Sequence, residues 1–217
     1  SDTSRIGSTP LLLSAVAVDS DYVYCGSMRG TLEVIEIGSW RHVISINGHT
    51  ERITCIVADD ERVYAASEDK SVSVWHKESW RAAGRIQSGL GWVYGLAVDA
   101  DHIYTGCSMN IIRVWDKKTL ECVRTLTGHT HYVIELVSDD EFLYSSSRDC
   151  TVRVWRKADW RPLHIIPHEQ QGDGLATDGE LLYSSHQDGQ IVAYDLSELR
   201  SSAASGATED AETTGGA

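Results

Sequence analysis

The fold is decided by residues 63–76, which read VYAASEDKSVSVWH. The pattern returns without gaps as VYCGSMRGTLEVIE (23–36), IYTGCSMNIIRVWD (103–116), LYSSSRDCTVRVWR (143–156) and LYSSHQDGQIVAYD (182–195). The tyrosines of the five segments are 40, 40, 40 and 39 residues apart, at Tyr24, Tyr64, Tyr104, Tyr144 and Tyr183. A fixed period of this length is the signature of a repeat architecture.

Each repeat alternates apolar and polar residues over short runs, which is typical of β-strands and not of helices. In the second repeat the runs predict strands over residues 53–58, 62–67, 71–76 and 81–87, separated by acidic and polar turn residues. A four-stranded unit cannot bury both of its faces alone, so neighbouring units must stack, and radial stacking of such sheets gives a propeller. The predicted fold class is all-β, a β-propeller of five four-stranded antiparallel blades.

The repeats set the predicted boundaries. The propeller occupies residues 11–195, with repeats over approximately 11–48, 49–88, 89–128, 129–167 and 168–195. The last repeat lacks an evident fourth strand, and residues 4–8 of the N-terminal segment, residues 1–10, take the aligned position of a closing strand. Residues 196–217 are acidic and rich in Ser, Ala, Gly and Thr, which predicts a disordered tail. Closure of a five-blade ring and membership of a larger propeller both stay open.

Short motifs within the repeats carry a family resemblance. Gly-His pairs open two repeats, and tryptophans end three of the third strands; these are Gly48-His49, Gly128-His129, Trp75, Trp115-Asp116 and Trp155. Together with the period of 40 residues, these motifs resemble the tryptophan-aspartate (WD) repeat family. The resemblance covers nearly all of residues 11–195 and implies a propeller that holds partner proteins together.

The resemblance also implies a hydrogen-bond network of His, Ser, Asp and Trp inside the repeats. The predicted members are His49, Ser67, Asp69 and Trp75 in the second repeat, His129, Ser147, Asp149 and Trp155 in the fourth, and His168 and Asp188 in the fifth. The acid is expected to accept from the imidazole, and the hydroxyl is expected to link the imidazole to the indole. Because the set recurs in different repeats, it predicts scaffolding and not a Ser-His-Asp nucleophilic triad, which occurs once per domain.

Three repeats depart from this pattern. The first has Thr9, Arg29 and Ile35 in place of the histidine, the acid and the tryptophan. The third has Met109 in place of the acid and Ser-Gly in place of Gly-His, which leaves Trp115 as the expected remnant of its network. Losing both partners costs less than losing one, because no buried group is then left unpaired. The fifth repeat has His186 in place of the serine and Tyr194 in place of the tryptophan.

Recognition is expected on loops at one end of the propeller, because the strands are committed to the scaffold. By resemblance, that end carries the start of each first strand and the turn before each network acid. The predicted partner-binding residues there are Trp92, Tyr132, Arg52, Arg148, Glu68, Gln171 and Gln187. Trp, Tyr and Arg dominate binding hot spots. The alternative that Trp92 and Tyr132 only cover the rim of the core stays open.

Two recurrent turns at the opposite end are second candidates. They are the Trp-Arg pairs Trp40-Arg41, Trp80-Arg81 and Trp160-Arg161, and the acidic turns at residues 59–61 and 139–141. Recurrence predicts that the tryptophans pack against a neighbouring blade. The acidic residues are expected to form turns, with attraction of a basic partner as the alternative.

Composition limits the partners. The formal charge of −13 and the lack of a dense Lys and Arg cluster predict no binding to nucleic acid. No window approaches the roughly 18 apolar residues that a membrane helix needs. Five cysteines without a CxxC pair, and no signal peptide pattern, predict reduced thiols and a cytoplasmic location. No motif predicts a metal or a cofactor, and membership of a larger multidomain chain stays open.

The predicted function is therefore a non-catalytic protein-protein interaction scaffold. The alternatives are a propeller enzyme, either a hydrolase or a lyase, and a sensor of a small ligand, both of which would use the central channel. An enzyme would need one cluster of carboxylates or histidines with perturbed pKa values in that channel.

Overall fold

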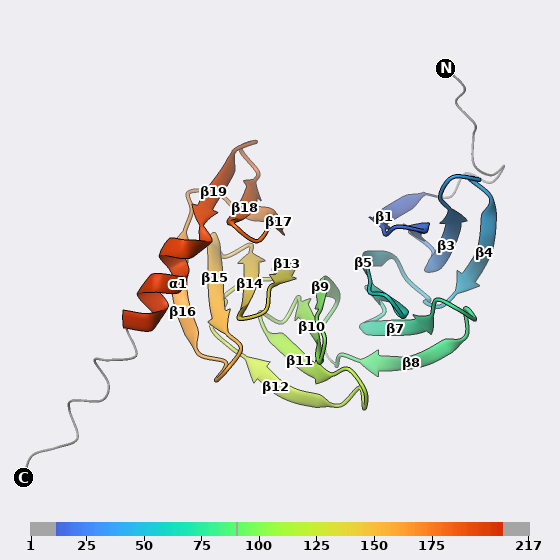
Figure 1. Ribbon diagram of the computed structural model, residues 1–217, viewed down its shortest axis with the longest axis horizontal. Coiled ribbons are helices and arrows are strands. Elements are labelled where there is room, and N and C mark those ends of the chain that lie inside the picture. Colours follow the sequence, from blue (N-terminus) through green and yellow to red (C-terminus); the bar gives the residue numbers. More distant parts are fainter. Residues whose placement is uncertain (1–11, 90, 206–217) are drawn as a thin grey trace, which may run out of the picture. The chain divides into compact units, whose positions relative to one another are not determined.

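The computed structural model describes residues 12–89 and 91–205 (Figure 1). The chain divides into two compact units, residues 1–133 and 134–217. The closing strand predicted within residues 1–10 lies outside the described residues.

The first unit contains three antiparallel sheets of four strands, one for each of the first three repeats. Their strands are β1 (Leu13–Val18), β2 (Tyr22–Ser27), β3 (Thr31–Glu36), β4 (His42–Asn47), β5 (Ile53–Ala58), β6 (Arg62–Ser67), β7 (Ser71–His76), β8 (Ala82–Gln87), β9 (Val93–Val98), β10 (His102–Cys107), β11 (Ile112–Asp116) and β12 (Cys122–Leu126). In each sheet the strands lie side by side in chain order. The four strands predicted for the second repeat are confirmed to within one residue.

The second unit contains the fourth and fifth repeats and one helix. Its strands are β13 (Val133–Ser138), which begins at the last residue of the first unit, β14 (Phe142–Ser147), β15 (Thr151–Arg156), β16 (Pro162–Pro167), β17 (Gly172–Thr177), β18 (Leu181–His186) and β19 (Ile191–Asp195). Strands β13 to β16 form a four-stranded sheet, whereas β17 to β19 form a sheet of three. The all-β fold class is confirmed, and the described fifth blade has the three strands that its own repeat supplies.

A helix, α1 (Leu196–Ser205), follows the last strand, where the sequence analysis predicted a disordered tail. The side chain of Asp195 accepts from the backbone N–H of Ser197 at 2.8 Å, which caps the first turn. Leu196 is fully buried in a cluster with Phe142, Tyr144 and other apolar residues of the second unit. The disorder prediction is therefore wrong for residues 196–205, and residues 206–217 lie outside the described residues.

Neighbouring repeats pack in the same way throughout the first unit. The third strand of one repeat shares an apolar cluster with the first strand of the next, so β3 packs with β5 and β7 packs with β9. The residues at equivalent positions are Leu32, Val34, Ile53 and Ile56 in one cluster, and Val72, Val74, Val93 and Leu96 in the other. Stacking of like blades thus buries faces that a single blade would leave exposed.

The repeated tyrosine fixes the turn between the first and second strands. Each tyrosine hydroxyl donates to an aspartate five residues earlier: Tyr24 to Asp19 at 2.6 Å, Tyr64 to Asp59 at 2.8 Å, Tyr104 to Asp99 at 2.6 Å, Tyr144 to Asp139 at 2.7 Å and Tyr183 to Asp178 at 2.8 Å. The first aspartate of each acidic turn is therefore a structural element, in agreement with the predicted turn-forming role.

A lysine directly after the third strand connects these turns from one repeat to the next. Lys77 lies 2.6 Å from the carboxylate of Asp19 in the preceding repeat, and it donates to the carbonyl of Asp59 in its own repeat at 3.0 Å. Burial favours a higher pKa for Asp19, but hydrogen bonds from Lys77, Tyr24 and the turn backbone outweigh it and lower the pKa to about 2.

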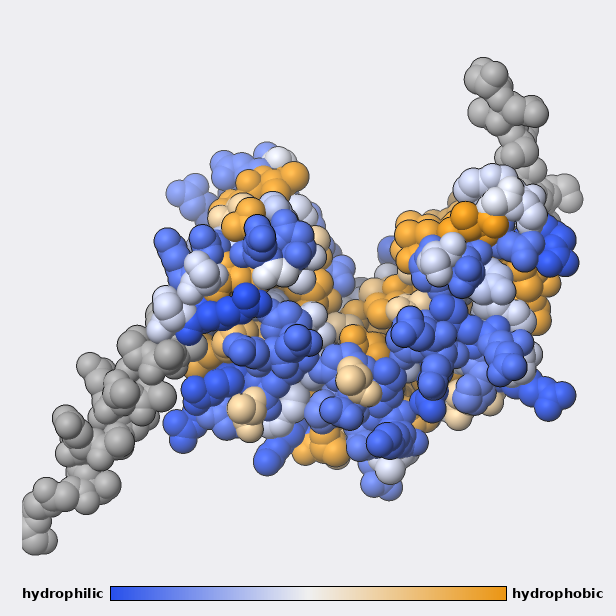
Figure 2. Space-filling view, in the orientation of Figure 1, coloured by the Kyte–Doolittle hydropathy of each residue, from blue (hydrophilic) through white to orange (hydrophobic). Residues whose placement is uncertain are grey.

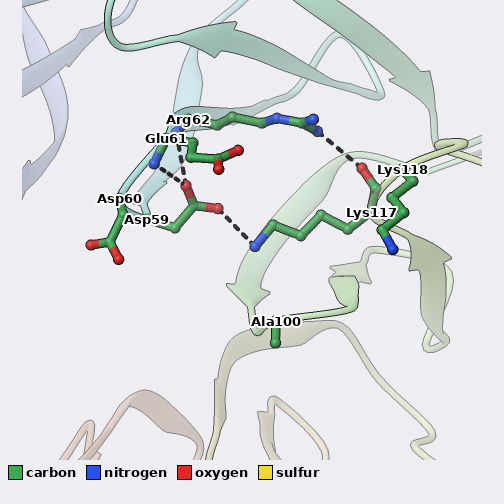
Figure 3. Close-up of a pocket in the computed structure, with 7 residues that line it drawn as sticks. All are labelled: Asp59, Asp60, Glu61, Arg62, Ala100, Lys117 and Lys118. Carbon is green, nitrogen blue, oxygen red and sulfur yellow. Dashed lines mark hydrogen bonds and ion pairs between the residues drawn. The ribbon is translucent and has the colours of Figure 1, made fainter.

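Lys117 repeats this arrangement one blade later. Its amine lies 2.9 Å from the carboxylate of Asp59 and donates to the carbonyl of Asp99 at 2.7 Å. Figure 3 shows the Lys117 side chain reaching Asp59, and the Arg62 guanidinium donating to the carbonyl of Lys117 at 3.0 Å. We call this arrangement the lysine clamp. In the second unit Arg200 of α1 takes a similar place, at 3.0 Å from the Asp139 carboxylate.

The turn between the third and fourth strands places its tryptophan against the preceding repeat. Trp80 has a positive φ of 56°, and its ring meets the ring of Tyr22 edge-on, with centroids 5.1 Å apart. The aligned residue of the third repeat, Leu120, packs against the apolar cluster of the second and third repeats. These contacts agree with the predicted packing role for Trp80, whereas Trp40 is 52% exposed.

Candidate functional site

The predicted His-Asp contact is present in the second repeat. The Nδ1 atom of His49 lies 2.9 Å from Oδ2 of Asp69, and the Nε2 atom lies 3.1 Å from the carbonyl oxygen of Ala65. Asp69 also accepts from the backbone N–H of Thr50 at 3.1 Å and from the hydroxyl of Ser71 at 2.5 Å. Burial lowers the pKa of His49, against the opposing effect of the Asp69 carboxylate. The group is buried and internally satisfied, as expected of a scaffold element.

The predicted role of the serine two residues before the acid is wrong for Ser67. Its hydroxyl donates to the carbonyl of Glu51 at 3.3 Å and accepts from the backbone N–H of Asp69 at 3.1 Å. The hydroxyl that meets the indole lies four residues before the position of the acid. Trp155 donates to Ser145 at 2.9 Å.

The third repeat keeps more of its network than predicted. The indole of Trp115 donates to the hydroxyl of Thr105 at 2.9 Å, so Trp115 is not an isolated remnant.

The residues predicted for a network in the fourth repeat are divided between the units, with His129 in the first and Asp149 in the second. Within the first unit, His129 is buried. Within the second, the backbone N–H of Asp149 donates to Ser147 at 3.1 Å, and the hydroxyl of Thr151 donates to Asp149 at 2.6 Å. The acid thus has the same turn contacts as Asp69.

The fifth repeat uses a different set of partners. The hydroxyl of Tyr194 lies 2.9 Å from Nε2 of His168, and the rings of His168 and His186 have centroids 4.0 Å apart. Asp188 is exposed and accepts from the backbone N–H of Gln190 at 3.0 Å. The described residues include no hydrogen bond between His168 and Asp188, so the predicted pairing of these two is wrong. Tyr194 replaces the acid as the partner of the histidine.

The predicted loop positions pair within each repeat. The N–H of Glu68 donates to the carbonyl of Arg52 at 3.0 Å, and their side chains approach to 3.9 Å. In the third repeat, Ser108 donates its backbone N–H to the carbonyl of Trp92 at 2.9 Å, and the N–H of Trp92 donates to the Ser108 hydroxyl at 3.0 Å. In these repeats, backbone hydrogen bonds therefore hold the start of the first strand beside the turn between the second and third strands.

The same pairing recurs in the fifth repeat. Gln187 donates its N–H to the carbonyl of Gln171 at 3.2 Å. Both glutamines and the exposed Arg148 belong to the second unit, whereas Arg52, Trp92 and Tyr132 belong to the first. The structure thus pairs Arg52 with Glu68 in the first unit and Gln171 with Gln187 in the second.

Trp92 and Tyr132 are connected by a residue that the sequence analysis missed. Tyr94 stacks on Tyr132, with ring centroids 5.9 Å apart and an interplanar angle of 27°, and meets Trp92 edge-on at 6.4 Å. The ring centroids of His131 and Tyr132 are 4.5 Å apart. Trp92 is 46% exposed. We call Trp92, Tyr94, His131 and Tyr132 the aromatic platform.

Tyr94 was detectable in principle. It is an aromatic residue two positions after Trp92, near the start of β9. A second missed residue, Arg85, donates to Asp69 at 2.8 Å and to the carbonyl of Gly48 at 2.8 Å. No repeat signal marks it, because Thr125 and Ile165 hold the aligned positions.

Glu135 on β13 is a titratable group that no motif indicated. The other repeats have Ala15, Cys55, Gly95 and Gly174 at this position. Burial raises the pKa of Glu135 to about 7, although a hydrogen bond from the backbone N–H of Leu136 works in the opposite direction.

The raised pKa of Glu135 predicts a pH dependence of stability. Between the ordinary pKa of 4.5 and the folded value of about 7, the folded chain holds a proton that the unfolded chain releases. The free energy of unfolding should therefore fall as the pH rises through this window. Glu135→Gln should raise it by about 3 kcal/mol at pH 8 and leave it nearly unchanged at pH 4.5. Urea denaturation at the two pH values measures the effect, and an equal effect at both would contradict the assignment.

No group of three or more His, Cys, Asp and Glu side chains suited to a metal ion occurs within residues 12–89 and 91–205. No helix in that part of the chain is long and apolar enough to cross a membrane. The five cysteines are free thiols, and Cys122 is exposed, whereas Cys25 and Cys107 are buried.

Comparisons with known proteins agree with this geometry. Residues 40–76 and 120–156 match the family model of the WD domain, G-beta repeat. No curated protein matches the chain in sequence. Two of the five repeats thus match the WD-repeat family model, and the all-β fold is similar to that of β-propeller structures, a fold typical of protein-interaction scaffolds.

Several solved structures are similar to the chain. The computationally designed Ika8 protein has a TM-score of 0.78 at 25% identity, over 85% of this chain and 58% of its own. The structure of U3-55K has a TM-score of 0.82 at 21% identity, over 88% and 63%. A chain of the mitotic checkpoint complex has a TM-score of 0.79 at 17% identity, over 84% and 62%. The chain thus spans about three fifths of the length of these structures.

Proposed function

We propose that this chain is a non-catalytic scaffold that binds a partner protein or peptide through the aromatic platform. The observation that carries the proposal is the exposed ring of Trp92, held in place by Tyr94 and by the backbone bonds to Ser108. Rigid aromatic side chains give a large contact area at little entropic cost, which is what binding hot spots need.

Arg52 and Glu68 supply charge in the second repeat, which precedes the repeat of Trp92. The Arg52 side chain stays 42% exposed, although it lies 3.9 Å from Glu68. A segment that places an apolar side chain on Trp92 and a polar group near Arg52 would use both features. Arg148, Gln171 and Gln187 are proposed as further contacts on the second unit.

Catalysis is not supported by the polar cluster that most resembles a reactive site. The hydroxyl of Ser184 lies 2.8 Å from Nε2 of His186, as a nucleophile would lie from its base. Ser184 is fully buried, however, so a substrate would not reach its hydroxyl. We further propose a cytoplasmic location, which suits the free thiols, and partners other than nucleic acid, which suits the charge of −13.

The test compares three baits in a quantitative capture experiment. The double variant Trp92→Ala, Tyr132→Ala should capture its specific partner at least about tenfold less than the wild type, because two hot-spot side chains are removed. Trp40→Ala is the matched control, since Trp40 is 52% exposed and lies in a turn at the opposite end of its blade. Equal capture by the double variant and the wild type would reject the platform as the binding site.

A further inference from the structure

Two faces of the chain have the form of a repeat interface with one side missing. Ile53 and Ile56 of β5 are buried because the preceding repeat covers them. The aligned residues of the first repeat, Leu13 and Val16, are 56% and 71% exposed. Among the described residues of the first unit, none covers this apolar strand as the preceding repeats cover β5 and β9.

The fifth repeat has the complementary face. Ile191 of β19 is 74% exposed, whereas the aligned residues Val72, Ile112 and Val152 are fully buried. Figure 2 shows hydrophobic surface over β1 and, in the second unit, near the strands of the fifth repeat. In the inner repeats this third-strand face is covered by the first strand of the following repeat.

The fifth repeat also lacks a cation. Asp178 accepts from Tyr183, as its counterparts do in the other repeats. Asp19 and Asp59 each receive a lysine from the following repeat, and Asp139 receives the guanidinium of α1. Within the part of the chain that the structure describes, no Lys or Arg forms an ion pair with Asp178. The turn therefore presents a preformed acceptor for a lysine.

We propose that the fifth-repeat face docks a blade of a partner protein that has an apolar first strand and a lysine directly after its third strand. The apolar strand would cover Ile191, and the lysine would complete the lysine clamp at Asp178. The first repeat of this chain does not meet both conditions, because Ile37 holds the aligned position of Lys77 and Lys117. Complementary apolar area and a complementary charge thus specify the kind of partner.

A variant of this chain can serve as the partner blade in a test of the proposal. Ile37→Lys gives a second copy both the apolar strand, with Leu13 and Val16, and the lysine. Ile37→Met is the matched control, because methionine has similar length and no charge. Sedimentation equilibrium at about 0.1 M salt measures self-association, where exposed charges are screened beyond about 10 Å. The association constant of Ile37→Lys should be about tenfold that of Ile37→Met. Adding Asp178→Asn should return it to the value of Ile37→Met.

Four results would overturn the proposal. Equal association of the Lys and Met variants, or a gain that survives Asp178→Asn, would show that no clamp forms. A wild type that associates as tightly as Ile37→Lys would identify a second copy as the occupant. Ile37→Lys that stays monomeric but gains thermal stability dependent on Asp178 would identify the chain's own first repeat as the occupant.

Discussion

Asp69→Ala is expected to lower the free energy of unfolding by about 3 kcal/mol. The change leaves His49, the N–H of Thr50, the hydroxyl of Ser71 and the guanidinium of Arg85 without their shared acceptor. Buried polar groups that lose a partner bear the full cost of desolvation. Urea denaturation followed by tryptophan fluorescence measures the loss.

The fifth repeat offers a matched control for this change. Asp188 holds the aligned position but is exposed and bonds only the backbone N–H of Gln190 among the described residues. Asp188→Ala should change the free energy of unfolding by less than about 0.5 kcal/mol. His49→Ala should cost less in the Asp69→Ala background than alone, because the two residues act as a pair. Similar small losses at positions 69 and 188 would show that the buried network does not stabilise the blade.

The second large effect is expected at the start of α1. Leu196→Ala should lower the free energy of unfolding by about 2 to 4 kcal/mol, because it removes a fully buried side chain from the apolar cluster of the second unit. Alanine favours the helix, so the loss reports packing and not helix propensity. Thermal denaturation followed by circular dichroism gives the change.

An exposed position on the same helix serves as the control. Ser201→Ala should leave the free energy of unfolding within about 0.5 kcal/mol of the wild type. If Leu196→Ala were equally neutral, α1 would contribute nothing to the fold. In that case Arg200 would not be expected to hold Asp139 either.

The five blades and their strands were predictable because the signal repeats. The tyrosine and the turn aspartate recur at a fixed spacing, and each pair closes the same turn. A sequence pattern that recurs in five repeats is easier to recognise than one that occurs once. Contacts unique to one repeat, such as that of Arg85 with Asp69, have no such reinforcement.

The serine assignment failed for a geometric reason. Residues two and four positions before the acid lie on the same face of a strand, so alternation alone does not distinguish them. In the second repeat the nearer position is Ser67 and the farther one is Ala65, which made the nearer serine the evident candidate. Repeats three and four show that the farther position, Thr105 or Ser145, meets the indole.

The prediction of disorder for residues 196–205 failed for a compositional reason. Its two anchoring leucines, Leu196 and Leu199, stand at the edge of a stretch rich in Ser and Ala, and composition averaged over that stretch indicates disorder. Which cluster the leucines enter depends on tertiary packing, which local composition does not report.

Site-specific photo-crosslinking tests the proposed binding function most directly. A benzophenone side chain placed at position 92 should form a covalent adduct with a partner protein, because the ring there is exposed and forms part of the aromatic platform. The same probe at position 40 should form no adduct with that partner. Adducts at position 40 and none at position 92 would place binding away from the platform and contradict the account.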